Sequence, residues 1–309
     1  KKFSYKIEIT LSKKFNIFND QYSGWNPNKM RVSKSFSPSK NWFNKNINLK
    51  KKFLLDKKTD FLIIPEIWAH FSEDLNLKKK GINYGIFIQG FYHMNSTSNF
   101  KKLKSAYNNA KIILISSDYN IKCFKEMFPE FKNKILRMNF SINSKKLRIS
   151  KKSNTITYMP RKLPDHSQLL LFYLKNLLPS NWKIIPLENV SDNYLISSLS
   201  HSKFFLSFSN LEGLGIPPIE AALSGNKVIG YTGGGGTEYW KEPMFKKIEN
   251  GDISNFGKKL LYEIQNYKKN WIHKTKKNRL KLERQYSAEI EKKSLNLLIN
   301  KVNNFYKIN

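Results

Sequence analysis

Residues 209–240 read SNLEGLGIPPIEAALSGNKVIGYTGGGGTEYW, and this stretch decides the fold. Glycine is scarce in the chain, with 14 in 309 residues, yet eight of them lie in this stretch. Two carboxylates, Glu212 and Glu220, flank a Gly-x-Gly and a pair of prolines. Prolines suit the first turn of a helix, where their missing N–H groups cost little, and a glycine suits its end. The stretch therefore predicts a helix over 217–224, with Glu212 in the loop before it, and a strand over 227–231.

Apolar runs rich in β-branched residues recur along the rest of the chain, separated by segments with helical spacing. Strands are predicted at 61–65, 84–89, 111–116, 135–140, 155–158, 183–187, 204–208 and 227–231. Further helices are predicted at 166–178 and 192–201. Continuous apolar strands alternating with helices are typical of parallel sheets covered on both faces. The charged stretch 143–154 divides the strands into two series, so we predict two α/β domains of similar size.

The two ends of the chain are less informative. From about residue 255 onward the sequence predicts charged helices, the last of which packs against its own domains rather than on a membrane surface. Its predicted buried stripe consists of Leu295, Leu297, Leu298 and Val302. Before residue 58 only one strand is indicated, at 5–10.

The charge of the chain is strongly positive. Lys plus Arg number 55 against 23 acidic residues, giving a net charge of +32. Only six of the basic residues are arginine, the residue whose planar fork suits phosphate best, and they are spread along the chain. We therefore expect no specific nucleic-acid binding, while an anionic membrane surface stays open as a partner. The single cysteine, Cys123, and the lack of an apolar run of about 18 residues favour a cytoplasmic protein, peripheral to a membrane at most.

Functional groups follow the predicted strands of the second series. Ligands bind at the carboxyl ends of parallel strands, and all these ends lie on one edge of a sheet. Cations follow 155–158, a polar loop follows 183–187, Glu212 with two glycines follows 204–208, and the glycine run follows 227–231. Cations and free helix N–H groups suit phosphate, and carboxylates suit vicinal hydroxyls. The sequence therefore predicts a site for a ligand that carries both.

The pair Glu212-x7-Glu220 resembles the E-x7-E signature of retaining glycosyltransferases with the GT-B fold, particularly the family 4-like group. FFLSFSNLEGLG is similar to the strand and loop of that family, YTGGGGTEYW to its later glycine-rich turn, and ENGDISNFGKKL to a later helix. The resemblance is specific over about 155–265 and looser over 80–150.

This resemblance implies an α/β fold of two Rossmann-like domains with parallel sheets facing a cleft, and a C-terminal helix that packs back across the domains. Residues 1–150 would form the acceptor-side domain, 151–285 the nucleotide-sugar-binding domain, and 286–309 the C-terminal helix. The implied reaction moves a sugar from a nucleotide-diphosphate donor to a saccharide or lipid-linked acceptor, as in polysaccharide biosynthesis. Neither a metal nor a cofactor beyond the donor is implied.

The resemblance also implies roles for single residues. Glu212 would contact the transferred sugar, while Arg161 and Lys162 would neutralise the diphosphate leaving group. Glu220 would bind the ribose hydroxyls, and Asn189, Val190 and Ser191 would cradle the base. The remaining predicted donor-binding positions are Gly213, Leu214, Gly215, Gly234 and Gly235. The candidates from the N-terminal domain are Gln89, His93 and Gly24.

Departures from the family pattern leave alternatives open. Asp165 and His166 stand where the family places a lysine after its arginine, and its N-terminal glycine-rich loop is not evident. The chain also lacks an initiating Met, so a fragment or an inactive relative is one alternative. The rival function is a non-catalytic basic α/β protein that binds nucleic acid or anionic membrane. Epimerisation of a nucleotide sugar is a third reading.

Overall fold

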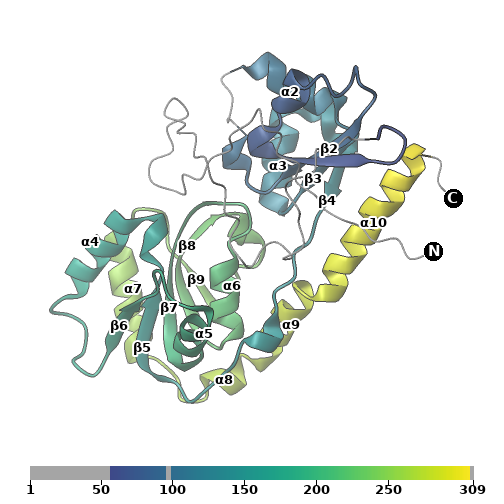
Figure 1. Ribbon diagram of the computed structural model, residues 1–309. Coiled ribbons are helices and arrows are strands. Elements are labelled where there is room, and N and C mark those ends of the chain that lie inside the picture. Colours follow the sequence, from purple (N-terminus) through teal and green to yellow (C-terminus); the bar gives the residue numbers. More distant parts are fainter. Residues whose placement is uncertain (1–55, 95–98, 307–309) are drawn as a thin grey trace.

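The computed structural model of the chain describes residues 56–94 and 99–306, which form two parallel sheets (Figure 1). The first sheet has four strands in the order β1-β2-β3-β4, and the second has five in the order β6-β5-β7-β8-β9. The strand predicted at 5–10 and the candidate Gly24 lie outside the described residues.

The N-terminal lobe is built on the first sheet. Its strands are β1 (Phe61–Pro65), β2 (Asn83–Ile88), β3 (Ile112–Ile115) and β4 (Ile135–Arg137), and its helices are α1 (Phe71–Asp74), α2 (Phe100–Asn109) and α3 (Asp118–Met127). Side chains of β3 alternate between two cores, as the period of a strand requires. Ile113 and Ile115 pack against residues of α2 and α3, whereas Ile112 and Leu114 point to the opposite face.

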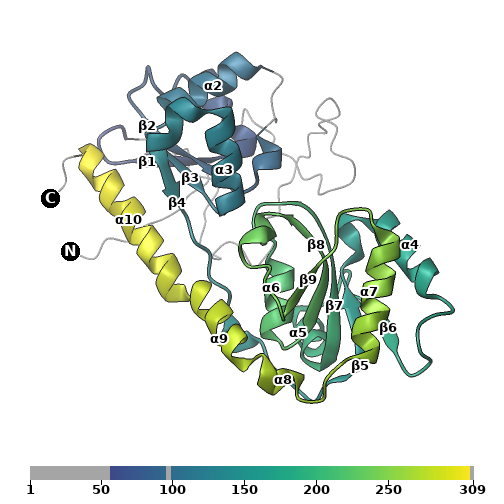
Figure 2. The same ribbon diagram turned by 180° about the vertical axis from the view of Figure 1, so that it is seen from behind.

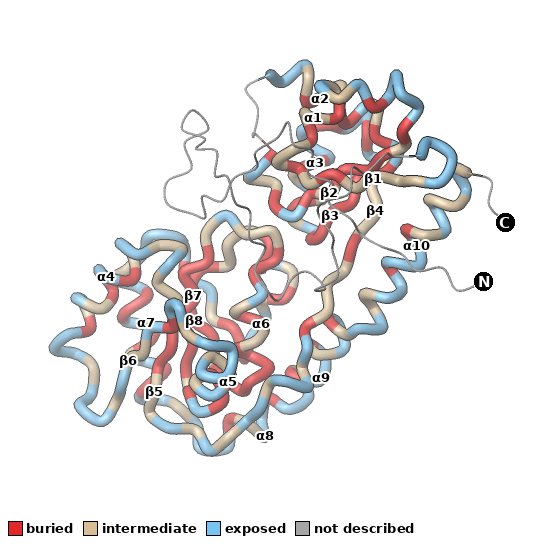
Figure 3. Tube along the Cα trace, in the orientation of Figure 1, coloured by how far each residue is buried: buried red, intermediate tan, exposed pale blue. Residues whose placement is uncertain are grey.

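The C-terminal lobe is built on the second sheet. Its strands are β5 (Ser153–Tyr158), β6 (Lys183–Pro186), β7 (Ser202–Glu212), β8 (Lys227–Gly234) and β9 (Phe245–Lys247). Its helices are α4 (Pro164–Leu174), α5 (Asp192–His201), α6 (Ile216–Leu223), α7 (Ile253–Gln265), α8 (Trp271–Lys274) and α9 (Lys276–Gln285). One face of the sheet packs on α5, α6 and α9, and the other packs on α4 and α7. Buried residues are accordingly concentrated in the strands (Figure 3).

The last helix, α10 (Ala288–Tyr306), leaves the C-terminal lobe and runs alongside the N-terminal lobe (Figures 1 and 2). Leu298 and Val302 pack against the face of the first sheet that α2 and α3 leave uncovered. This helix therefore packs back across the molecule, as predicted. The predicted stripe is wrong in part, because Leu295 and Leu297 are exposed. The row that faces the N-terminal lobe is Ser294, Leu298 and Val302, spaced by four residues. Leu295 and Leu297 lie to either side of this row.

All eight predicted strands of the described residues are present, with ends shifted by a few residues. One prediction was wrong in a way that matters for the site: β7 does not end at residue 208 but continues through Glu212. The strand passes a register shift between Ser209 and Glu212, where Leu211 has a φ of 51°. Glu212 is therefore fixed by sheet hydrogen bonding rather than placed in a loop. The short edge strand β9 was not predicted.

Candidate functional site

The carboxyl ends of the two sheets meet at one place, which we call the interlobe contact. It joins the segment 89–93, which follows β2, to Gly213 after β7 and Gly234 at the end of β8. A Cβ atom added to Gly213 would lie 1.6 Å from the carbonyl oxygen of Gln89, and one added to Gly234 would lie 2.4 Å from the Tyr92 hydroxyl. The glycines therefore let backbone and side chains of the two lobes touch.

An ion pair stands beside this contact. Lys162, in the turn after β5, places its Nζ 3.0 Å from Oε1 of Glu212, and both side chains are partly shielded from water. His93, from the N-terminal lobe, lies near enough for both charges of the pair to act on its ring. Burial lowers the pKa of His93, the charge of Lys162 lowers it further, and the charge of Glu212 opposes both. Two of the three predicted catalytic residues and a predicted residue of the other lobe thus come together.

Glu220 lies in the second turn of α6 and is half-buried. Burial raises the pKa of its carboxyl, and the charge of Asp192 raises it further. A carboxylate held among poorly solvated surroundings gains from hydrogen-bond donors that a ligand would bring, such as vicinal hydroxyls.

The N-terminus of α6 offers fewer N–H donors than the prediction assumed. Gly215 caps the helix with a φ of 79°, and of the first three helical residues only Ile216 has an N–H, because Pro217 and Pro218 follow it. The helix dipole still favours an anion here, but most of its hydrogen bonding to phosphate would have to come from side chains. Arg161 lies in the same turn as Lys162 and is exposed, so both cations follow β5 as predicted.

The predicted base-binding loop has mixed surroundings. Asn189 is exposed and has a φ of 51°. Val190 packs against the core of the C-terminal lobe, and the Ser191 hydroxyl accepts a hydrogen bond from the Tyr194 N–H at 3.3 Å, capping α5. Asn189 and Ser191 are therefore exposed, whereas Val190 is partly buried.

Three other predicted donor-binding positions are taken up by protein contacts. Leu214 is buried in the core of the C-terminal lobe. The carbonyl of Gly215 accepts a hydrogen bond from the Tyr239 hydroxyl at 2.6 Å. A Cβ atom on Gly235 would lie 1.9 Å from the carbonyl oxygen of Gly213, so this glycine allows the two loops to stack. A donor role for these glycines stays a prediction.

A second link between the lobes centres on Glu238, at the end of the glycine run. Its Oε1 and Oε2 atoms accept hydrogen bonds from Arg137 at 2.9 and 3.1 Å, and Oε2 accepts one from the Asp118 N–H at 2.9 Å. The Tyr286 hydroxyl donates to Oε1 at 2.9 Å, and Arg137 also pairs with the Asp118 carboxylate. These partners lie between 48 and 120 residues away along the chain, and no sequence pattern indicated them.

His166 does not take the place of the lysine that the family pattern has after its arginine. Its ring meets Tyr231 edge to face, and Nδ1 lies 3.2 Å from the Tyr231 hydroxyl. The ring is thus engaged with the sheet, and Lys162 is the lysine that reaches Glu212.

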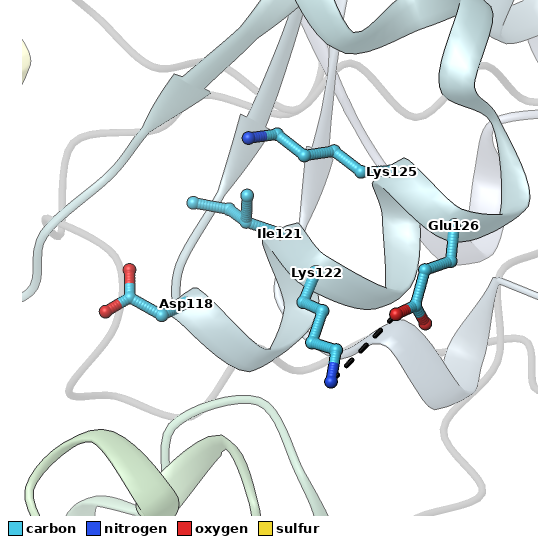
Figure 4. Close-up of a pocket in the computed structure, with 5 residues that line it drawn as sticks. All are labelled: Asp118, Ile121, Lys122, Lys125 and Glu126. Carbon is cyan, nitrogen blue, oxygen red and sulfur yellow. Dashed lines mark ion pairs between the residues drawn. The ribbon is translucent and has the colours of Figure 1, made fainter.

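A surface hollow of about 440 Å³ runs along α3 (Figure 4). It is lined by Asp118, Ile121, Lys122, Lys125 and Glu126. Lys122 and Glu126 pair across it at 4.0 Å. Within 56–94 and 99–306, no three His, Cys, Asp or Glu side chains gather as metal ligands would, and no helix is long and apolar enough to cross a membrane.

Sequence comparison identifies no relative: no protein-family model and no curated protein matches the chain. Similar solved structures do exist. Staphylococcus aureus TarM, crystallised with fondaparinux, α-GlcNAc-glycerol and UDP, is 16% identical with a TM-score of 0.60 over 78% of this chain and 55% of its own. Sucrose-phosphate synthase from Thermosynechococcus elongatus is 11% identical with a TM-score of 0.59 over 78% of this chain and 73% of its own.

A third similar structure is the pneumococcal O-GlcNAc transferase GtfA in complex with UDP and GlcNAc, with 14% identity and a TM-score of 0.50 over 76% of this chain and 59% of its own. The chain thus spans little more than half the length of TarM and GtfA. At such identities the likeness establishes the fold. The chain has the two-lobed GT-B fold of these glycosyltransferases.

Proposed function

We propose that this chain is a glycosyltransferase that moves a sugar from a nucleoside-diphosphate donor to a saccharide or lipid-linked acceptor, with retention of configuration. The observation that carries the proposal is the meeting of the Glu212–Lys162 pair with His93 of the opposite lobe, on the same sheet edge as Glu220. Two of the structures with this fold were solved with UDP bound.

The charged side chains of the candidate site suit the charges that develop on the donor during sugar transfer. The bond between the anomeric carbon and the diphosphate oxygen breaks, so negative charge grows on the leaving group, which Arg161 and Lys162 can balance. The sugar gains positive, oxocarbenium-like charge, which the Glu212 carboxylate stabilises. The acceptor hydroxyl forms the new bond to the anomeric carbon, and its proton leaves with the diphosphate oxygen.

Donor binding is assigned mainly to the C-terminal lobe. Glu220 accepts hydrogen bonds from the ribose hydroxyls, and these donors offset its burial without a counter-ion. Asn189 lies exposed for contact with the base. The acceptor approaches from the N-terminal lobe, on the side of His93. An anionic membrane surface is compatible with the net charge of +32 and would hold a lipid-linked acceptor near the site.

A panel of nucleotide sugars tests the proposal. We expect one donor to raise the melting temperature at millimolar concentration and to release its nucleoside diphosphate when incubated with the protein, slowly without an acceptor and faster with one. Product analysis must find a transferred or hydrolysed sugar, since an epimerised nucleotide sugar would indicate the alternative enzyme. If no donor and no nucleoside diphosphate shifts the melting temperature while DNA binds in a salt-sensitive manner, the rival binding function is correct.

A further inference from the structure

We propose that Asn120 is a positioning residue, which sets the register between the segment carrying His93 and the segment carrying Glu212. Its catalytic meaning rests on the proposed function, but its structural basis does not. Asn120 lies in the first turn of α3 and is fully buried. Its side chain has one hydrogen-bond partner in each lobe.

The two hydrogen bonds of Asn120 define the bridge. Oδ1 accepts from the Phe91 N–H at 3.2 Å, and Nδ2 donates to the carbonyl oxygen of Gly213 at 3.0 Å. The orientation of the amide is set by its partners, because an N–H can only donate and a carbonyl can only accept. Phe91 stands two residues before His93, and Gly213 directly follows Glu212. The bridge therefore links the backbone beside each of the two functional side chains.

The bridge is itself held rigidly. The Asn120 N–H donates to the Ser117 hydroxyl that caps α3, which fixes the helix end from which the side chain projects. The segment after β2 is held by two more groups of its own lobe. The buried Glu66 carboxylate accepts from the Gly90 N–H at 3.0 Å, and the Ser116 hydroxyl donates to the Gln89 carbonyl at 3.1 Å. Little freedom remains in the backbone that leads to His93.

On the other side of the bridge, Gly213 has no room to shift toward the N-terminal lobe, because its α-carbon already lies against Gln89. Gly235 also lies close to the Gly213 carbonyl, since a Cβ atom added to it would lie 1.9 Å from that oxygen. Among the described residues, Asn120 is the side chain of the opposite lobe that donates a hydrogen bond to that carbonyl. Removing the donor would leave the carbonyl buried without its partner, which favours separation of the two segments.

The test compares Asn120→Asp with a matched control, Asn109→Asp. The first change keeps the acceptor for Phe91 but sets a carboxylate oxygen against the Gly213 carbonyl. Asn109 also donates through Nδ2 to an oxygen, that of Glu73 at 3.0 Å, but both partners belong to the N-terminal lobe. Both variants thus lose an amide donor and gain a repulsion. It acts between a carboxylate and a carbonyl of the other lobe in Asn120→Asp, and between two carboxylates of one lobe in Asn109→Asp.

We expect Asn120→Asp to lower kcat about 10- to 100-fold with a donor KM within about threefold of wild type, since a displacement near 1 Å is enough for such a loss. Asn109→Asp should lower thermal stability but leave both constants nearly unchanged. His93→Gln should lower kcat less in the Asn120→Asp variant than in wild type. The reason is that Asn120→Asp already displaces the segment that carries His93. Hydrogen exchange should rise in peptides covering 86–94 and 211–216 in Asn120→Asp and not in the control.

Wild-type kcat in Asn120→Asp, or unchanged exchange in both peptides, overturns the proposal. Failure of the proposed function would be recognised separately, because the wild-type protein would then turn over no donor at all. In that case exchange alone decides: a rise confined to Asn120→Asp supports the interlobe restraint, and no rise rejects it.

Discussion

Replacing Glu212 by glutamine is expected to lower kcat about 100- to 1,000-fold at saturating donor, the range seen when one electrostatic group is removed from a reacting centre. The carboxylate lies 3.0 Å from the Lys162 ammonium. Glutamine keeps the size of the side chain but removes the negative charge that offsets both this ammonium and a sugar that is becoming positive. Because donor affinity comes mainly from groups elsewhere on the lobe, the donor KM should change much less than kcat.

The measurement is release of nucleoside diphosphate under steady-state conditions. Glu249→Gln is the matched control, since Glu249 also pairs with a lysine of the C-terminal lobe, Lys247, but is mostly exposed. That variant should retain wild-type turnover. A Glu212→Gln enzyme within about threefold of wild type would remove Glu212 from the reaction.

A second large loss of kcat is expected from Gly213→Ala, a substitution that adds only one methyl group. Gly213→Ala would place a methyl group 1.6 Å from the carbonyl oxygen of Gln89 and 2.8 Å from its carbonyl carbon. Both are backbone atoms, and Gly90 and Glu66 hold that backbone in place. The lobes must therefore move apart at the interlobe contact, so that His93 leaves Glu212. We expect kcat to fall by about 100-fold or more, because the reacting groups are displaced by over 1 Å.

Gly81→Ala separates this effect from a general loss of stability. Gly81 has a φ of 71°, and a Cβ atom added there would meet only Lys57 of the same lobe, at an ordinary contact distance of 3.5 Å. Alanine there therefore carries a backbone cost of roughly 1 kcal/mol and no clash with the other lobe. It should lower the melting temperature without lowering kcat. Wild-type turnover in Gly213→Ala, or an equal loss of activity in Gly81→Ala, would show that the close contact at Gly213 does not control the reaction.

Much of the fold could be predicted because its physical signal is local. Runs such as Lys111–Ser116 and Phe204–Phe208 are short, largely apolar and rich in β-branched or aromatic residues, which favours strands covered on both faces of a sheet. Strand β9 escaped prediction because it is three residues long and two of them are lysine. The stripe of α10 was placed too widely, since its partner surface on the first sheet is not visible in the helix sequence.

The part of the candidate site that the C-terminal lobe supplies could be predicted from the sequence. The spacing of Glu212 and Glu220 is a property of one strand, turn and helix, and Lys162 follows a neighbouring strand on the same edge. The interlobe contact was not predictable in this way. Asn120 stands in the sequence as an ordinary residue of a capped helix, and its partner Gly213 lies 93 residues away. Glycine was expected beside a ligand, whereas Gly213 and Gly234 lie directly against the other lobe.

The most direct test compares the binding of a nucleoside diphosphate to wild-type protein and to Glu220→Gln. Binding is measured at neutral pH by the shift in thermal unfolding. The raised pKa of Glu220 means that the folded chain holds this proton more tightly than the unfolded chain. Its carboxyl therefore stabilises the fold at low pH, and that contribution is lost as pH rises through the raised pKa. Without ligand, Glu220→Gln should melt at or above the wild-type temperature, so any loss of binding cannot be ascribed to misfolding.

With ligand, the order should reverse. Wild-type protein is expected to gain about 2.7 kcal/mol at a ligand concentration of about 100 times Kd. Glu220→Gln should bind about 10- to 100-fold more weakly, the loss expected when a charged acceptor of hydroxyl hydrogen bonds becomes neutral. Equal affinity in the two proteins, or no binding of UDP, GDP or ADP to the wild type, would contradict a nucleotide-sugar site at Glu212 and Glu220.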